Sequence, residues 1–139
     1  MALTDICKDW IKSATHDFIA IESIVMQVQN PRIRPHEIVL YHCQQASEKM
    51  LKVYLVKNGV SPWGHNLNAL RTSCESIDSG FASKRLVDHC AFLTAYSVAR
   101  YPDFTDTIDA RTAARGINSA KRIYDFVSER LGLGKVYFR

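Results

Sequence analysis

The sequence has no apolar run that approaches the length of a membrane-spanning helix, and it has almost none of the alternating apolar and polar pattern that predicts β-strands. Apolar residues make up 47% of its 139 residues and charged residues 23%, which is typical of a globular chain. This balance excludes intrinsic disorder, collagen and low-complexity repeats. A chain of this length has room for one core of ordinary size, so we expect a single domain over residues 1–139.

The cysteines form no C-x-x-C pair, the spacing typical of zinc sites and thioredoxin-like redox sites. His16 and His42 lie in helical patterns and have no cysteine or paired carboxylates at ligand spacing, so the sequence predicts neither a metal nor a cofactor. Asp5, Lys8 and Asp9 occupy positions where a secretory signal has an apolar run. We therefore expect a cytoplasmic protein that does not bind membranes and keeps four thiols reduced: Cys7, Cys43, Cys74 and Cys90.

Apolar residues instead recur every three or four positions, which is the period of amphipathic helices. The pattern predicts four long helices over residues 4–28, 36–58, 82–99 and 107–131, and a short helix over residues 66–77. Long helices joined by short connections favour an all-α fold. We predict an antiparallel up-and-down four-helix bundle with one additional short helix.

Several residues are typical of helix ends. Thr4 is suited to cap the first helix, and Thr105 or Thr107 to cap the last. Gly59 follows the second helix, where a left-handed backbone conformation is common. His36 opens the second helix, and we expect it to be exposed.

The second predicted helix is apolar around most of its circumference, so we expect neighbouring helices to cover most of it. A narrow polar strip remains on it, formed by Gln45, Glu48, Lys49 and Lys52. Glu48 and Lys52 are four residues apart in the order that favours a local ion pair, and Gln45 and Lys49 have the same spacing. The strip therefore has two interpretations. It either satisfies itself through such contacts, or Lys49 and Lys52 present ammonium groups to a phosphate or a partner's carboxylate.

Four motifs occur in order along the chain: the run from Cys43 to Lys52, then Gly59, then His65-Asn-Leu67, then Ala99-Arg-Tyr-Pro-Asp103. Together with Asp17 in the first helix, they resemble the HEPN domain family over essentially the whole chain. The resemblance implies a four-helix bundle with an added short helix, commonly assembled as a homodimer. It also implies several functions, because the family includes metal-independent ribonuclease toxins, non-catalytic nucleotide-binding members, and proteins that pair with a minimal nucleotidyltransferase antitoxin.

The catalytic motif of the family's ribonucleases is absent in its usual form. Those members carry an Arg and a His separated by four to six residues, late in the domain. Here Arg85 and His89 have three residues between them, and no histidine follows His89. This pair is the weaker, catalytic alternative, because one turn of helix places both side chains on the same face. The other interpretation is a solvated Arg85 and a packed His89. The sequence also lacks a Gly-rich phosphate loop and a Ser-His-Asp arrangement.

The whole chain has a net charge of +4, and its basic residues gather towards the C-terminal end. Arg111 and Arg115 follow one another along the last predicted helix, on a stripe with Arg122. Such a stripe either follows an anionic partner such as RNA or is an ordinary solvated surface. Arg100 near a helix C-terminus either caps that helix and pairs with Asp103, or lines a nucleotide groove beside Tyr101, as the family resemblance implies.

We therefore expect a HEPN-type binding module that binds a nucleotide, pairs with a minimal nucleotidyltransferase, or does both. The alternatives are a metal-independent ribonuclease of a toxin–antitoxin system and a non-catalytic structural adaptor. The candidate nucleotide-binding or anion-binding residues are Lys49, Lys52, Arg100, Tyr101, Asp103, Arg111 and Arg115.

Overall fold

The computed structural model describes residues 3–96 and 108–133. These residues form five α-helices and one short 3-10 helix, with no strand among them, which confirms the all-α prediction. The helices are α1 (Asp5–Gln27), α2 (His36–Lys57), α3 (Leu67–Glu75), α4 (Lys84–Ala95) and α6 (Ala110–Arg130), and the 3-10 helix η1 (Ser79–Ala82) precedes α4.

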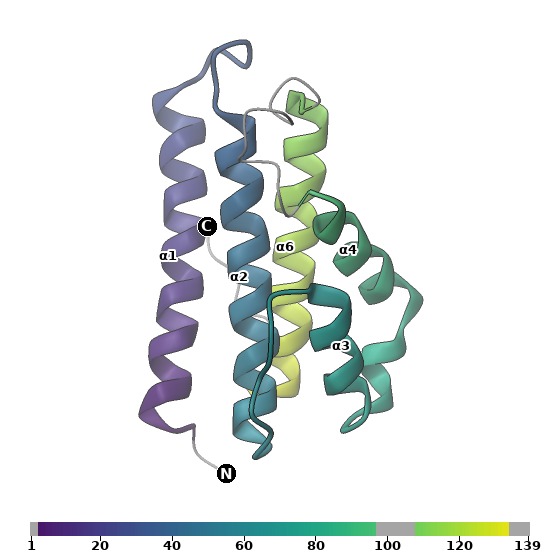
Figure 1. Cartoon of the computed structure of the whole chain (residues 1–139). Helices are drawn as coiled ribbons and strands as arrows, with labels where there is room; N and C mark the ends of the chain where they lie inside the picture. The colour runs from purple at the N-terminus through teal and green to yellow at the C-terminus, as the bar shows by residue number, and fades with distance from the viewer. Residues whose placement is uncertain (1–2, 97–107, 134–139) are drawn as a thin grey trace.

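The long helices alternate in direction along the chain. In Figure 1, α1 and α4 run upward, whereas α2 and α6 run downward. The central element is α2, which packs against α1 on one side and against α6 on the other. The short α3 packs against α2 and α4, and α4 lies against α6. This arrangement confirms a helical bundle with one added short helix.

The central position of α2 follows from its sequence. Val39, Cys43 and Met50 are fully buried, as expected for a helix that is apolar on most sides. The weakly amphipathic pattern of α2 contrasts with that of α6, where Ala113, Ala120 and other buried residues lie on one face. A helix without a clear polar face can only be stable when other elements surround it.

The helix ends agree with most of the predicted signals. The Thr4 hydroxyl accepts a hydrogen bond from the amide of Cys7 and caps α1. Gly59 follows α2 with a φ of +76°, a conformation that glycine adopts without strain. The last helix is present as predicted, but the prediction of Thr105 or Thr107 as its N-cap is wrong, because α6 begins at Ala110 and its cap is Asp109. Its carboxylate accepts from the amide of Thr112, and this hydrogen bond lowers the pKa of Asp109 below its ordinary value.

His36 also differs from expectation. It is buried rather than exposed, and its Nε2 lies 2.8 Å from the carbonyl oxygen of Pro31. The turn before α2 folds back on the first residue of the helix, and this local contact removes the imidazole from solvent. Within the described residues, no helix is both long enough and apolar enough to cross a membrane.

Candidate anion-binding site

A cavity of about 470 Å³ lies between the start of α4 and the middle of α6. The cavity is lined by Ser83, Arg85, Leu86, His89, Arg122 and Phe126, and none of these residues is acidic. Two guanidinium groups and one imidazole therefore border the same hollow. Arginine presents several N–H donors in a planar fork, which suits the oxygen atoms of a phosphate.

Helix periodicity explains why these side chains converge. Arg85 and His89 are one turn apart on α4, and Arg122 and Phe126 are one turn apart on α6. Because α4 packs against α6, the two pairs face a common space. Ser83 caps α4 by accepting a hydrogen bond from the amide of Leu86, so the N-terminal turn of the helix forms one edge of the cavity.

His89 is held in place from α6. Its Nδ1 lies 2.9 Å from the hydroxyl oxygen of Ser119, which is itself buried. Burial lowers the pKa of His89 below its ordinary value, and the positive charge of Arg122 acts in the same direction. The imidazole is therefore neutral at pH 7. It acts as a hydrogen-bonding group there, while Arg85 and Arg122 carry the positive charge of the cavity.

The arginines of the predicted basic stripe lie along α6, but they have different surroundings. Arg115 lies with its guanidinium carbon 4.2 Å from the centre of the Phe92 ring on α4, a cation–π contact. Its charge also contributes to lowering the pKa of His89. Arg111 is exposed on the first turn of α6 and does not line the cavity. Arg122, further along the stripe, does line it.

Lys49 and Lys52 lie elsewhere, between α1 and α2. Lys52 is 3.0 Å from Glu48, which confirms the local ion pair predicted from their spacing. Lys49 pairs with Asp17 of α1 at 2.7 Å and not with Gln45. With Trp10 and Ser13, these two lysines and Glu48 line a separate hollow of about 230 Å³. A carboxylate thus lies against each ammonium group before any ligand binds.

A polar network surrounds these two carboxylates. Asp17 also contacts Nδ1 of His42 at 2.8 Å, and Glu48 contacts Nδ1 of His65 at 2.9 Å. The side-chain amide of Gln44 donates to Glu48 and to the backbone carbonyl of His65. The network joins α1, α2 and the turn before α3, and it gives Asp17 and Glu48 a structural role that accounts for their burial.

Some residues at the α4–α6 cavity could not be predicted from the sequence. Ser119 and Phe126 belong to no motif, and both reach the site only through helix packing. Ser83 could have been found, since a serine three residues before Leu86 at the start of an amphipathic segment is typical of an N-cap. The predicted residues Arg100, Tyr101 and Asp103 lie outside the described residues. Within the described part of the chain, no group of His, Cys, Asp or Glu side chains is placed to hold a metal ion.

Comparison with protein-family models identifies the family of this chain, and two solved structures share its fold. The HEPN domain model matches residues 7–131. The crystal structure of TT1696 from Thermus thermophilus has a similar fold, with a TM-score of 0.78 and 22% identity over 91% of this chain and 99% of that chain. ST0689, an archaeal HEPN homologue, superposes with a TM-score of 0.71 and 22% identity over 90% of this chain and 97% of its own. No curated protein matches the chain. With a family model that spans nearly all of the described bundle, this chain belongs to the HEPN domain family.

Proposed function

We propose that this HEPN domain is a binding module for a phosphate-bearing ligand of the nucleotide class, and that the phosphate occupies the α4–α6 cavity. The observation that carries the proposal is the convergence of Arg85, Arg122 and His89 on one cavity without an acidic lining residue. Lys49 and Lys52 are weaker candidates, because each already has a carboxylate partner. A ligand phosphate would have to compete with Asp17 and Glu48 for them.

Calorimetric titration with ATP tests the proposal, with adenosine as the uncharged probe. We expect saturable ATP binding that weakens with added salt, and no binding of adenosine. Arg122→Gln and Arg85→Gln each remove a charged donor and should weaken ATP binding by about tenfold. Lys84→Gln is the matched control, because Lys84 is exposed on the same turn of α4, pairs with Asp88 and does not line the cavity. Equal affinity in the wild type and Arg122→Gln would reject the site.

A metal-independent ribonuclease is the second candidate, because Arg85 and His89 do line the same cavity. The lowered pKa of His89 suits a general base, which must be unprotonated at the working pH. RNA cleavage in the presence of EDTA, lost in both Arg85→Gln and His89→Gln, would support catalysis. Intact RNA together with ATP binding would reject catalysis and support the binding module.

Pairing with a minimal nucleotidyltransferase remains a proposal that the family membership supports. A small nucleotidyltransferase encoded next to this chain would be the partner to test. Copurification of the two proteins, each expressed with a different affinity tag, would support pairing, and separation of the two during size-exclusion chromatography would count against it.

A further inference from the structure

A second cavity, of about 230 Å³, opens between α1 and α6, on the opposite face of α6 from the phosphate cavity. In the described part of the chain, the backbones of α1 and α6 make no close contact, and their separation leaves this space. The edge-on contact between Phe18 and Tyr124, with ring centres 5.5 Å apart, joins the two helices beside the opening. The cavity therefore belongs to a fixed arrangement of two long helices.

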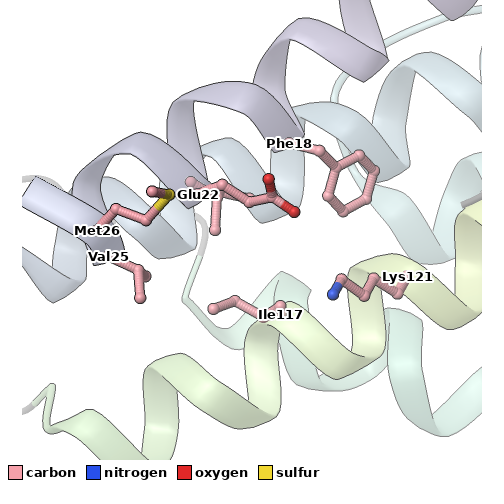
Figure 2. Close-up of a pocket in the computed structure, with 7 residues that line it drawn as sticks. Phe18, Glu22, Val25, Met26, Ile117 and Lys121 are labelled. Carbon is pink, nitrogen blue, oxygen red and sulfur yellow. The ribbon is translucent and has the colours of Figure 1, made fainter. Parts of the chain in front are cut away.

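Apolar side chains form most of the wall of this cavity. The lining residues are Phe18, Ile21, Glu22, Val25, Met26, Ile117 and Lys121. Figure 2 shows the α1 side chains on one side of the opening and Ile117 and Lys121 on the other. Phe18 and Ile21 are buried, whereas Met26 is 69% exposed at the rim. An apolar hollow with a few convergent polar groups, between helices of a bundle, is typical of a small-molecule site.

The volume of the cavity limits the size of its ligand. Pockets for drug-sized molecules measure about 300–1,000 Å³, and an apolar protein cavity of about 150 Å³ takes up benzene. In proportion, a volume of about 230 Å³ accommodates about nine non-hydrogen atoms. Leucine, isoleucine and methionine have this size, whereas a nucleotide is much larger. The ligand of this cavity is therefore different from that of the phosphate cavity.

The cavity carries one acidic and one basic residue, on opposite walls. Glu22 belongs to α1 and Lys121 to α6, and their charged groups point into the opening in Figure 2. Both residues are half-buried. Neither side chain forms an ion pair or a hydrogen bond with any residue in 3–96 or 108–133. The apolar hollow is therefore bordered by two unused charges of opposite sign.

We infer that this cavity binds a free apolar α-amino acid of the size of leucine. Its α-ammonium group contacts Glu22 and its α-carboxylate contacts Lys121, which gives two charged hydrogen bonds. Its side chain packs between Phe18, Val25 and Ile117. An amine alone would leave Lys121 unpaired, and a carboxylic acid alone would leave Glu22 unpaired. Only a zwitterion satisfies both half-buried charges at once, because it carries both groups beside one apolar side chain.

Titration of the isotope-labelled whole chain, followed by NMR through its amide chemical shifts, tests the site. The probes are leucine, leucinamide, which lacks the carboxylate, isocaproate, which lacks the ammonium group, and glycine, which lacks the apolar side chain. We expect saturable shifts with leucine, strongest at the cavity residues of α1 and α6, and binding about tenfold weaker for each of the other three probes. Absence of saturable leucine binding, or equal binding of leucine and any one of these analogues, would overturn the inference.

Two substitutions assign each ligand charge to its wall. In Glu22→Gln, leucine and isocaproate should bind equally, because the ammonium group no longer has a charged partner. In Lys121→Gln, leucine and leucinamide should bind equally for the corresponding reason. Asp9→Asn on α1 and Arg111→Gln on α6 are the matched controls, because both residues are exposed and neither lines the cavity.

The controls should keep the preference of the wild type for leucine over both analogues. The same preference in Glu22→Gln or in Lys121→Gln would overturn the inference. The site does not depend on phosphate binding, because the phosphate cavity lies on the other face of α6. ATP binding should therefore be unchanged in both variants, and failure of the amino-acid site and failure of the phosphate site are measured separately.

Discussion

The carboxylate of Asp17 on α1 contacts two side chains of α2, those of Lys49 and His42. This carboxylate lies 2.7 Å from Lys49 and 2.8 Å from His42, and the Asp17 side chain is only 9% exposed. Removing one partner of a buried ion pair costs more than the pair itself contributes, because the remaining charge stays partly buried without compensation. Asp17 therefore stabilises the contact between α1 and α2.

We expect Asp17→Ala to lower the free energy of unfolding by about 2 kcal/mol, below the usual cost for a fully buried pair because Lys49 is 27% exposed. Urea denaturation followed by circular dichroism measures the change. Asp9→Ala is the control, since Asp9 is an exposed acid on the same helix, and it should change stability by less than about 0.5 kcal/mol. Equal effects of the two substitutions would show that the Asp17 contacts contribute nothing.

His89 makes the stability of the fold depend on pH. Burial, followed by the charge of Arg122, lowers the pKa of His89, and Arg115 and Arg85 act in the same direction while Asp88 opposes them. The unfolded chain therefore binds a proton near pH 6.5 that the folded chain does not bind. Stability contributed by the neutral imidazole is present above this pH and is lost as the pH falls towards the lowered folded value.

In the wild type, the urea midpoint should therefore fall more steeply between pH 7 and pH 5.5 than in His89→Gln. The variant keeps a side chain that can hydrogen-bond with Ser119 but does not titrate. The difference between the two profiles isolates His89 from the other histidines. Parallel profiles would mean that His89 binds its proton equally well in the folded and unfolded chains.

Gly116 sets the close approach of α6 to α2. A Cβ at this position would collide with Cδ2 of Leu40, which is itself buried in the core. Alanine is favoured over glycine inside a helix by about 1 kcal/mol, so helix propensity and packing act in opposite directions at this position. We expect packing to dominate, because a core side chain that is surrounded on all sides cannot move away without strain.

Gly116→Ala should therefore lower the free energy of unfolding by about 1–2 kcal/mol despite its better helix propensity. The double variant with Leu40→Val provides the test, because the shorter side chain removes the colliding methyl group. The alanine should then cost nothing or stabilise the fold, and the two substitutions should be strongly non-additive. Additive effects in urea denaturation would contradict the proposed collision.

At the scale of the helices, the sequence was most informative where the signal is local. The helical period and the caps at Thr4 and Gly59 depend only on near neighbours, and they were predicted. The Glu48–Lys52 pair was predicted for the same reason. The partners of His89 and Lys49 were not, because Ser119 and Asp17 come from other helices, 30 and 32 residues away in the chain. Only the packing angles and contact positions of the helices determine such pairs.

The whole molecule is organised around α2, and the other helices differ in which neighbours they pack against besides α2. α6 has a second neighbour in α4, whereas α1 packs on α2 alone among the described helices. Cooperative units that make fewer contacts open at lower free energy. We therefore expect α1 to separate from the bundle before α2 loses its structure.

Four buried free thiols allow the order in which the helices separate to be measured in the unsubstituted chain. Cys7, Cys43, Cys74 and Cys90 lie one each on α1, α2, α3 and α4, and all are nearly inaccessible. Burial raises the pKa of Cys74 and of Cys90 to about 12, so at pH 8 these thiols react only after their surroundings open. The thiol on each helix therefore reports when that helix is exposed.

Alkylation with iodoacetamide under native conditions, read peptide by peptide in a mass spectrometer, should modify Cys7 first and Cys43 last. Cys7 lies on the first turn of α1, where its sulfur contacts the carbonyl oxygen of Val53 at 4.0 Å, and opening of α1 alone exposes it. Cys43 lies at the middle of α2 and reacts only when the bundle comes apart. Equal rates at all four cysteines would show that the bundle opens only as a single unit.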